Sequence, residues 1–144
     1  MQTIALRFAD NFAPSEGTIA AHEALIQSKG YTWYGKMGNP ISADTINMVL
    51  ESCPAKVLLI HSGTQKRYWA YVDAISREYP GDGEFPEYYF DKGKKIGAWL
   101  RIVRFEDAPK DIMSKCVVIS SGAKLSYTSR HSMSPYFRIE VEED

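Results

Sequence analysis

The segment KGYTWYGKMGNP, residues 29–40, places two large aromatic side chains, Trp33 and Tyr34, between glycines. Aromatic faces can stack on a flat ligand such as a nucleobase, and neighbouring glycines allow the backbone to turn sharply or a ligand to come close. The same rings can equally be part of a hydrophobic core. In an extended segment the two side chains point to opposite faces, so we expect at most one of them to stack on a ligand.

Two pairs of polar residues follow apolar stretches and are candidates for contacts with the edge of a base. Asp10 and Asn11 follow TIALRFA, and His61 and Ser62 follow VLLI. An asparagine side chain can both donate and accept hydrogen bonds, as recognition of a base edge requires. The alternative for the first pair is turn formation. The alternative for the second pair is the capping of backbone groups at a strand end.

The segment GAWLRIVRFED supplies further candidates. Trp99 and Arg101 share one face of a strand expected there, so Trp99 could floor a groove or be buried in the core. Arg101 could contact a phosphate or remain a solvated surface charge. The other cations that could meet phosphates are Lys66, Arg67 and Arg104.

Several kinds of chemistry are disfavoured by what the sequence does not contain. Its 3 histidines and 2 cysteines show no metal-ligand spacing, and we find no phosphate-binding glycine loop, nucleophile elbow or paired acid and base. We therefore expect no catalysis, no metal and no cofactor. The net charge of -1 disfavours tight nonspecific binding to nucleic acid. The lack of a cationic leader, of a long apolar run and of a cysteine framework predicts a cytoplasmic protein that does not bind membranes.

The pattern of apolar residues predicts more strand than helix. Helices are expected where apolar side chains recur at helical spacing, with Gly30 ending the first helix and Ser42 capping the second. The expected strands are 3–9, 31–36, two strands of a hairpin within 56–77, 97–107, 116–120 and 136–142, and the expected helices are 17–30 and 42–53, with one helical turn within 108–115. We expect loops at 78–95 and 120–135, the second being a polar loop or lid.

The second strand of the hairpin carries large apolar side chains on both faces. Alternation places Tyr68 and Val72 on one face, and Trp69, Tyr71 and Ile75 on the other. A strand of this kind lies in the centre of a sheet, or in a sheet that curls toward a barrel. Alternation in the 97–107 strand groups Trp99, Arg101, Val103 and Phe105 against Leu100, Ile102 and Arg104. We predict a single α+β domain over residues 1–144, built on a small curled mixed sheet or partly open barrel with two main helices packed outside.

The order and spacing of these segments resemble the PUA-like superfamily, and within it the EVE and YTH branch. LLIHSG is similar to the EVE pattern of an apolar strand that ends in a His-Ser pair before a hairpin. WYG resembles the Trp-x-Gly segment after the first helix, and AWLRIVRFEDAP resembles the strand that opens on the same groove. SPYFRIEV is similar to EVE-like domains fused to modification-dependent restriction proteins. The resemblance covers residues 3–142, and the negative net charge departs from the more basic members.

The resemblance implies a non-catalytic reader of a modified base. Such domains flip a nucleotide out of its stack and hold the base, often methylated, in an aromatic pocket. Trp33 matches the position of the family's cage tryptophan, which makes it the first candidate for a stacking wall. The implied partner is nucleic acid carrying a modified base, with DNA favoured over RNA. A fused or associated nuclease or NTPase of a restriction system is a further candidate partner.

Two other functions remain open on the sequence. The chain could be a PUA-like interaction domain that binds unmodified RNA or a protein. It could also be an ASCH-type enzyme acting on nucleoside-like compounds, which would need lysine, threonine and glutamate groups that converge in one pocket. We find no convincing set of this kind in the sequence.

Overall fold

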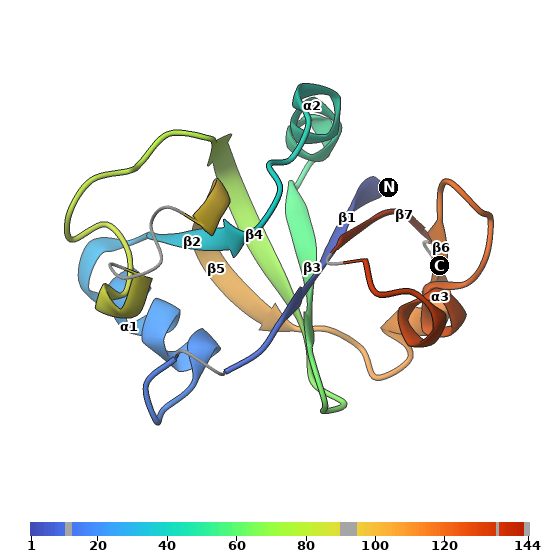
Figure 1. Ribbon diagram of the computed structural model, residues 1–144, viewed down its shortest axis with the longest axis horizontal. Coiled ribbons are helices and arrows are strands. Elements are labelled where there is room, and N and C mark those ends of the chain that lie inside the picture. Colours follow the sequence, from blue (N-terminus) through green and yellow to red (C-terminus); the bar gives the residue numbers. More distant parts are fainter. Residues whose placement is uncertain (11–12, 90–94, 135, 143–144) are drawn as a thin grey trace.

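Seven strands form one mixed sheet in the order β2-β5-β4-β3-β1-β7-β6 (Figure 1). The computed structural model describes residues 1–10, 13–89, 95–134 and 136–142. Only β1 and β3 pair in parallel among these strands, and the sheet curls without closing, so that β2 and β6 are its two ends. The predicted fold class is confirmed. The strands are β1 Gln2–Phe8, β2 Thr32–Met37, β3 Lys56–His61, β4 Arg67–Ser76, β5 Ile96–Asp107, β6 Cys116–Val118 and β7 Tyr136–Val141.

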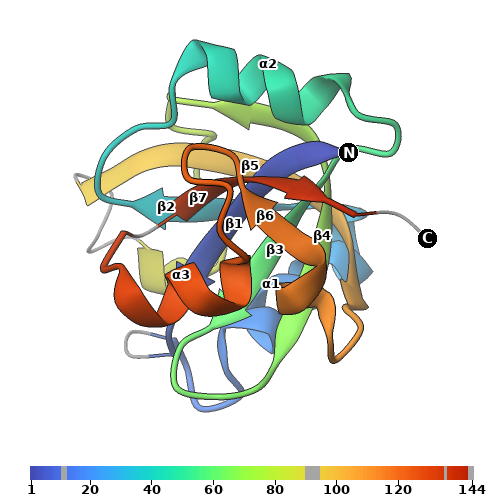
Figure 2. The same ribbon diagram turned by 90° about the vertical axis from the view of Figure 1, so that its right-hand side faces the viewer.

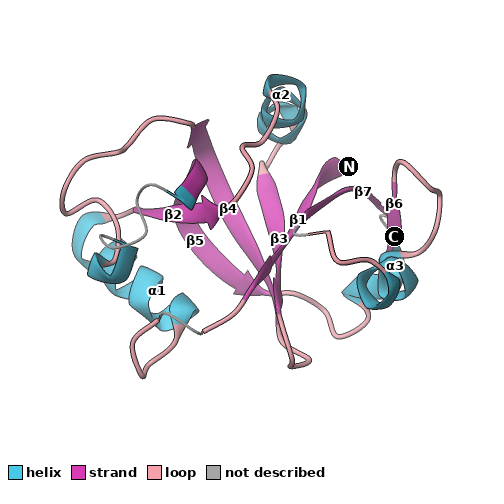
Figure 3. Cartoon of the chain, in the orientation of Figure 1, coloured by secondary structure: helices cyan, strands magenta, loops and turns pink. Residues whose placement is uncertain are grey.

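Two helices lie where the sequence predicts them, on the outside of the sheet (Figure 3). Helix α1, Thr18–Lys29, ends at Gly30, whose φ of 88° lies in the left-handed region that favours glycine. Helix α2, Ala43–Glu51, begins after Ser42, whose side chain accepts a hydrogen bond from the Thr45 amide. Helix α1 packs on β2 and β5, and α2 packs on β1, β3 and β4. None of the helices within the described residues has the length and apolarity to cross a membrane.

A third helix lies where we expected a polar loop or lid, so that prediction was wrong. Helix α3 spans Leu125–His131 and follows the predicted helical turn, η2, at Ile112–Lys115. It packs on β6 and η2 (Figure 2). Leu125 alone among the α3 residues is fully buried, and the helix N-terminus has no side-chain cap. A helix with one buried apolar residue has little periodic signal, and tertiary contacts stabilise it instead.

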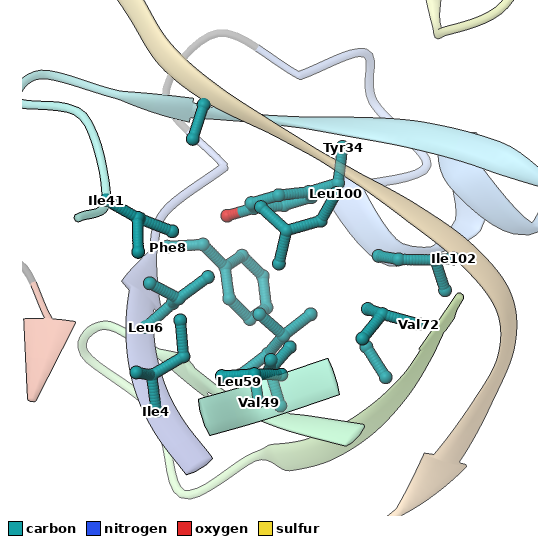
Figure 4. Packing of buried hydrophobic residues seen from close by; sticks show 13 residues of the cluster. Ile4, Leu6, Phe8, Tyr34, Ile41, Val49, Leu59, Val72, Leu100 and Ile102 are labelled. Carbon is teal, nitrogen blue, oxygen red and sulfur yellow. The ribbon is translucent and has the colours of Figure 1, made fainter. Parts of the chain in front are cut away.

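The main core fills the concave side of the sheet between β1, β2, β5 and α2 (Figure 4). Phe8 of β1 and Tyr34 of β2 belong to the same cluster, although these strands are not paired with each other. The fully or mostly buried members of this cluster are Ile4, Leu6, Phe8, Tyr34, Ile41, Val49, Val57, Leu59, Ala70, Val72, Ala98, Leu100 and Ile102. The main core therefore packs against both β1 and β2, two strands that diverge from each other.

Strand β4 separates this core from a second one, which confirms that its two faces are both apolar. Trp69 and Tyr71 pack in the second core with α3, β6 and β7 residues, whereas Val72 packs in the main core. Ile75 also packs against the main core, contrary to simple alternation, and so does Phe105 of β5. The pairing of β4 with β5 shifts twice, between Tyr71 and Val72 and between Val72 and Ala74. Each irregularity adds one residue to a strand, at Val103 and Asp73, and this reverses the faces beyond it.

Candidate functional site

A cavity of about 230 Å³ opens between the end of β1 and the edge of β2. Because the sheet is not closed, these two strands diverge here, and aromatic side chains together with backbone form the walls. We call this space the aromatic cavity. Its lining residues are Leu6, Arg7, Phe8, Ala9, Ala13, Thr18, Tyr34, Gly35, Lys36, Met37, Tyr88 and Tyr89.

Tyr34, rather than Trp33, lies in the wall of the aromatic cavity. The two side chains point to opposite faces of β2, as the alternation of a strand requires. Tyr34 packs in the main core, whereas Trp33 is half-buried against a third cluster that contains Phe85, Tyr89 and Trp99. Trp33 is therefore placed to support the cavity from behind, through Tyr89, and stands outside the lining of the aromatic cavity as the described residues define it.

Gly35 allows Tyr89 to pack directly on the β2 backbone. A Cβ atom at this position would lie 3.0 Å from Tyr89 Cε1, 3.0 Å from Ile96 Cδ1 and 3.2 Å from Trp99 Cζ3. Real Cβ contacts are rarely so short, so with any other residue at this position the ring would have to shift by a few tenths of an ångström. From the sequence we expected glycines in this segment to allow the close approach of a ligand. Gly35 allows the close approach of a protein side chain, Tyr89.

Tyr89 is held from the other side by a buried histidine of α1. The Tyr89 hydroxyl lies 3.0 Å from His22 Nε2, and His22 Nδ1 lies 2.7 Å from the Thr18 carbonyl oxygen. Burial lowers the pKa of His22 to about 4, so the ring is neutral at pH 7. Tyr88 stacks on Tyr89, with ring centroids 4.4 Å apart, and is only partly buried.

Within the described residues, parts of β1 and β2 beside the aromatic cavity lack a neighbouring strand on one side. Strand β2 is an end strand that pairs with β5 on one side, and β1 pairs with β7 only as far as Leu6. The stretches Arg7–Phe8 and Gly35–Lys36 therefore have strand edges that are free of ladder partners among the described residues. Such edges present N–H and C=O groups in fixed positions, which suits recognition of the polar rim of a planar ligand.

Lys36 is a buried cation beside the aromatic cavity. Its side chain donates to the carbonyl oxygens of Met37, at 3.2 Å, and Asn39, at 2.7 Å, and lies over the Tyr136 ring. Burial lowers its pKa. The cavity therefore has a positively charged residue at the β2 end in addition to its aromatic walls.

The structure brings two sequence candidates, Asp10 and His61, together in the lining of a neighbouring cavity of about 240 Å³. His61 stacks on Phe8, with ring centroids 4.8 Å apart, and its Nε2 lies 2.8 Å from Asp10 Oδ2. Asp10 Oδ1 accepts a hydrogen bond of 2.9 Å from the Thr18 amide, and this bond is the largest cause of the lowered pKa of Asp10. The Asp10 carboxylate thus satisfies the N-terminus of α1, since Gly17 at the cap position has no side chain to do so.

The remaining candidates lie at other places. Ser62 lies in the β3–β4 turn, where its amide donates to the Phe8 carbonyl. Trp99 is 3% exposed in the third cluster, so it is a packing residue behind the aromatic cavity. Arg101 pairs with Asp73 and lies over the Tyr31 ring, 4.1 Å from its centroid. Asn11 lies outside the described residues.

Sequence reasoning missed three aromatic residues of the cavity lining, namely Phe8 of β1 and the pair Tyr88 and Tyr89. The two tyrosines are neighbours in the sequence. They lie in the 78–95 segment, which its glycine, proline and glutamate content marks as a loop. The aromatic density of EFPEYYF was the available signal, because exposed loops seldom carry so many large rings. Within the part of the chain that the structure describes, no group of three or more His, Cys, Asp or Glu side chains could hold a metal ion.

Comparison with known proteins supports the architecture. No curated protein and no solved structure matches the chain. The Pua-like family model matches residues 4–136, a span that runs from within β1 to the first residue of β7 and includes the three helices and the lining of the aromatic cavity. The chain therefore belongs to the Pua-like family.

Proposed function

We propose that this protein is a non-catalytic nucleic-acid-binding module that holds one base, flipped out of its stack, in the aromatic cavity. The observation that supports this most is the wall formed by Phe8, Tyr34 and Tyr88 at the point where β1 and β2 diverge. Aromatic side chains on both sides of a narrow space are the arrangement that returns stacking energy to an extruded base.

The size of the cavity favours a single ring system. Its volume of about 230 Å³ is below the roughly 300–1,000 Å³ of pockets for drug-sized ligands. Flipping a base costs a few kcal/mol, and stacking on aromatic side chains returns about 1–3 kcal/mol per base. These two magnitudes are similar, so the phosphate and sugar contacts of the strand must supply the net affinity.

Discrimination between a methylated and an unmodified base requires more than the methyl group itself. Burial of one methyl group contributes about 0.8 kcal/mol, which corresponds to about a fourfold preference. Stronger selection would arise if the walls deny a hydrogen bond to the unmodified amine while the open edges of β1 and β2 bind the rest of the base. We propose a modified base, methylated in the simplest case, as the ligand.

The low net charge favours a partner that adds to the affinity, and the resemblance to EVE-like domains suggests which partner. A chain of net charge -1 gains little from nonspecific attraction to phosphates, so a larger assembly would supply part of the affinity. We propose that the protein acts in the cytoplasm as the specificity part of a modification-dependent restriction system. In that setting a fused or associated nuclease or NTPase would act on DNA that this module selects.

The test is binding of short oligonucleotides that differ only in methylation of one base, single- and double-stranded, at one fixed salt concentration. We expect the methylated form to bind several times more tightly than the unmodified form. Equal affinity for the two forms would support an interaction domain without preference for modified bases. No binding to any oligonucleotide by the natural full-length assembly would contradict the proposal.

Two variants separate the aromatic cavity from the third cluster behind it. Tyr88→Leu keeps apolar bulk but removes a half-buried ring of the cavity, so it should weaken binding by about 1–3 kcal/mol with a small change in melting temperature. Trp33→Leu should instead lower the melting temperature, because its ring packs in the third cluster, and leave affinity nearly unchanged. The reverse result would identify Trp33 as the stacking wall.

A further inference from the structure

A second pocket lies across the sheet from the aromatic cavity. Phe8 of β1 points into the main core, and its neighbour Arg7 points to the opposite face, toward α3. On that face the β3–β4 turn lies beside α3 (Figure 2), and the two enclose a pocket of about 230 Å³. We call it the arginine pocket. Its lining residues are Arg7, Ile60, His61, Ser62, Gly63, Thr64, Gln65, Arg67, Ser129 and Arg130.

The arginine pocket contains three guanidinium groups and no carboxylate among its described lining residues. Elsewhere, Arg101 and Arg104 form ion pairs with Asp73 and Glu106. The cavity on the other side of His61 has the opposite character, because Asp10, Glu16 and Glu23 line it. Arg67 and Arg130 also border a neighbouring pocket that Lys110 and Asp111 line. Three arginines and one lysine thus lie near a single carboxylate here, in a chain of net charge -1. Such a place attracts anions.

Two of these arginines hold the pocket walls and still have unused donors. Arg7 Nη2 donates to the carbonyl oxygens of Ser129, at 2.5 Å, and Ser132, at 2.8 Å. Arg67 Nη1 donates to the carbonyl oxygens of Thr64, at 3.0 Å, and Lys66, at 2.8 Å. The Nε atoms of both arginines are buried and make no hydrogen bond within the described structure.

Partly buried cations without a counter-charge are unfavourable. Partial burial lowers the pKa of Arg67, because desolvation disfavours the charged form. Removal of a charged group from water is offset when an opposite charge with matching hydrogen-bond acceptors enters the site. A tetrahedral anion offers several acceptor oxygens to guanidinium donors and to the hydroxyl groups of Ser62 and Thr64.

We infer that the arginine pocket binds a phosphate group through Arg67, Arg130 and the β3–β4 turn. The inference builds on the proposed function, because the natural source of this phosphate would be the backbone of the same nucleic acid. His61 lines both the arginine pocket and the cavity that contains Asp10, so it lies between the two faces. The strand would pass over the β3–β4 end of the sheet, with its base on one face and its phosphate on the other.

The first experiment uses inorganic phosphate and does not depend on base recognition. We would titrate phosphate into the ¹⁵N-labelled protein at constant ionic strength, with chloride as the competing anion, and follow amide chemical shifts. Saturable shifts confined to residues 62–64, 67 and 129–130 are expected. Shifts spread evenly over the surface, or no shifts, would overturn the inference.

Variants of the arginines show, in the same titration, which guanidinium groups bind the phosphate. Arg130→Gln removes an exposed guanidinium, so it should abolish saturation while the melting temperature stays close to that of the wild type. Arg67→Gln should act in the same direction, and its melting temperature shows whether the turn survives. The matched control is Arg138→Gln, because this exposed arginine of β7 contacts Met48 of α2 at the other end of the sheet. Equal binding by Arg130→Gln and Arg138→Gln would overturn the assignment.

The second experiment identifies the source of the phosphate. With a single-stranded oligonucleotide, Arg130→Gln should reduce the slope of log affinity against log salt by about 0.7, equally for methylated and unmodified strands. The charged phosphate at the linkage that occupies the pocket can be replaced by a neutral methylphosphonate. With that strand, wild type and Arg130→Gln should have the same salt slope. If phosphate saturates the pocket but no linkage has this effect, the pocket serves a free phosphate compound, and the backbone source is refuted. If phosphate saturates the pocket and no oligonucleotide binds, the proposed function fails while the anion site stands.

Discussion

The Nε2 atom of His22 accepts the hydroxyl proton of Tyr89 across 3.0 Å in the protein interior. The direction follows from the other ring nitrogen, because Nδ1 lies 2.7 Å from the Thr18 carbonyl, which can only accept. His22 is therefore the Nδ1-protonated neutral tautomer. The pair connects the first turn of α1 to a wall of the aromatic cavity, and it holds the hydroxyl of the ring that packs on Gly35.

Tyr89→Phe should lower the free energy of unfolding by about 1–3 kcal/mol. The substitution keeps the ring in the wall but leaves the fully buried His22 Nε2 without a donor. Urea unfolding monitored by circular dichroism measures the change. The control is Tyr79→Phe, because Tyr79 is 53% exposed and water can replace its partner. Equal losses in the two variants would refute a special role for the buried pair.

Stability should fall as the pH falls from about 6.5 to about 4. His22 has its pKa lowered from 6.5 to about 4, with burial as the largest cause. Between these values the unfolded chain binds a proton that the folded chain excludes, so acid favours unfolding. The contribution of His22 to stability is complete above pH 6.5 and is lost between pH 6.5 and about pH 4. Below about pH 4 it changes no further. The free energy of unfolding should fall by about 3 kcal/mol over the range from pH 6.5 to about pH 4. Urea unfolding at successive pH values measures the fall.

His22→Gln separates this histidine from the carboxylates. The amide oxygen of glutamine can still accept from Tyr89, but it does not titrate, so the slope between pH 6.5 and pH 4 should flatten. Asp10 acts in a different window, because its lowered pKa contributes stability that is present above pH 3.8 and is lost below it. A slope that is the same in wild type and His22→Gln would disprove the assignment.

Asp10→Ala should reduce stability by about 0.5–2 kcal/mol, the usual cost of losing a helix cap. The carboxylate accepts from the Thr18 amide and pairs with His61, so α1 loses its N-terminal acceptor. Thermal unfolding measures the loss. Glu16→Ala removes an exposed carboxylate beside the same helix and should change little. If Asp10→Ala and Glu16→Ala lose the same stability, the loss would come from long-range electrostatic interactions and not from the helix cap.

Much of the fold could be predicted because the patterns are local. The hairpin of β3 and β4, the caps at Gly30 and Ser42, and the two apolar faces of β4 are visible in residue order alone. The irregularities at Asp73 and Val103 could not be predicted, since nothing in the local sequence marks an extra residue in a strand pair. Tertiary pairing decides their positions.

The site was predictable only in part, because its walls come from distant segments. Phe8, Tyr34 and Tyr88 meet only when β1, β2 and the loop before β5 are placed together. From the sequence we named Trp33 first as a wall, whereas the structure places Tyr34 in the lining of the cavity. The choice between the two depends on which face of β2 is turned toward β1, and alternation gives opposite faces without saying which is which.

Gly35→Ala should weaken both the fold and the binding of a modified oligonucleotide. An added Cβ would meet Tyr89 and Ile96 at 3.0 Å, and overpacking of this kind costs about 1–3 kcal/mol. The backbone gain from replacing glycine in a strand is at most about 1 kcal/mol, so the steric cost should prevail. Calorimetry and oligonucleotide titration on one protein sample measure the two effects.

A second substitution tests whether Tyr89 transmits the effect. In the double variant Gly35→Ala and Tyr89→Leu, the smaller side chain leaves room for the new methyl group, so the combined loss of stability should be smaller than the sum of the single losses. Binding should not recover, because the ring that forms the wall is gone. Additive stability losses would mean that Gly35 acts through Ile96 and Trp99 instead, and that the wall formed by Tyr89 tolerates a shift of the β2 backbone.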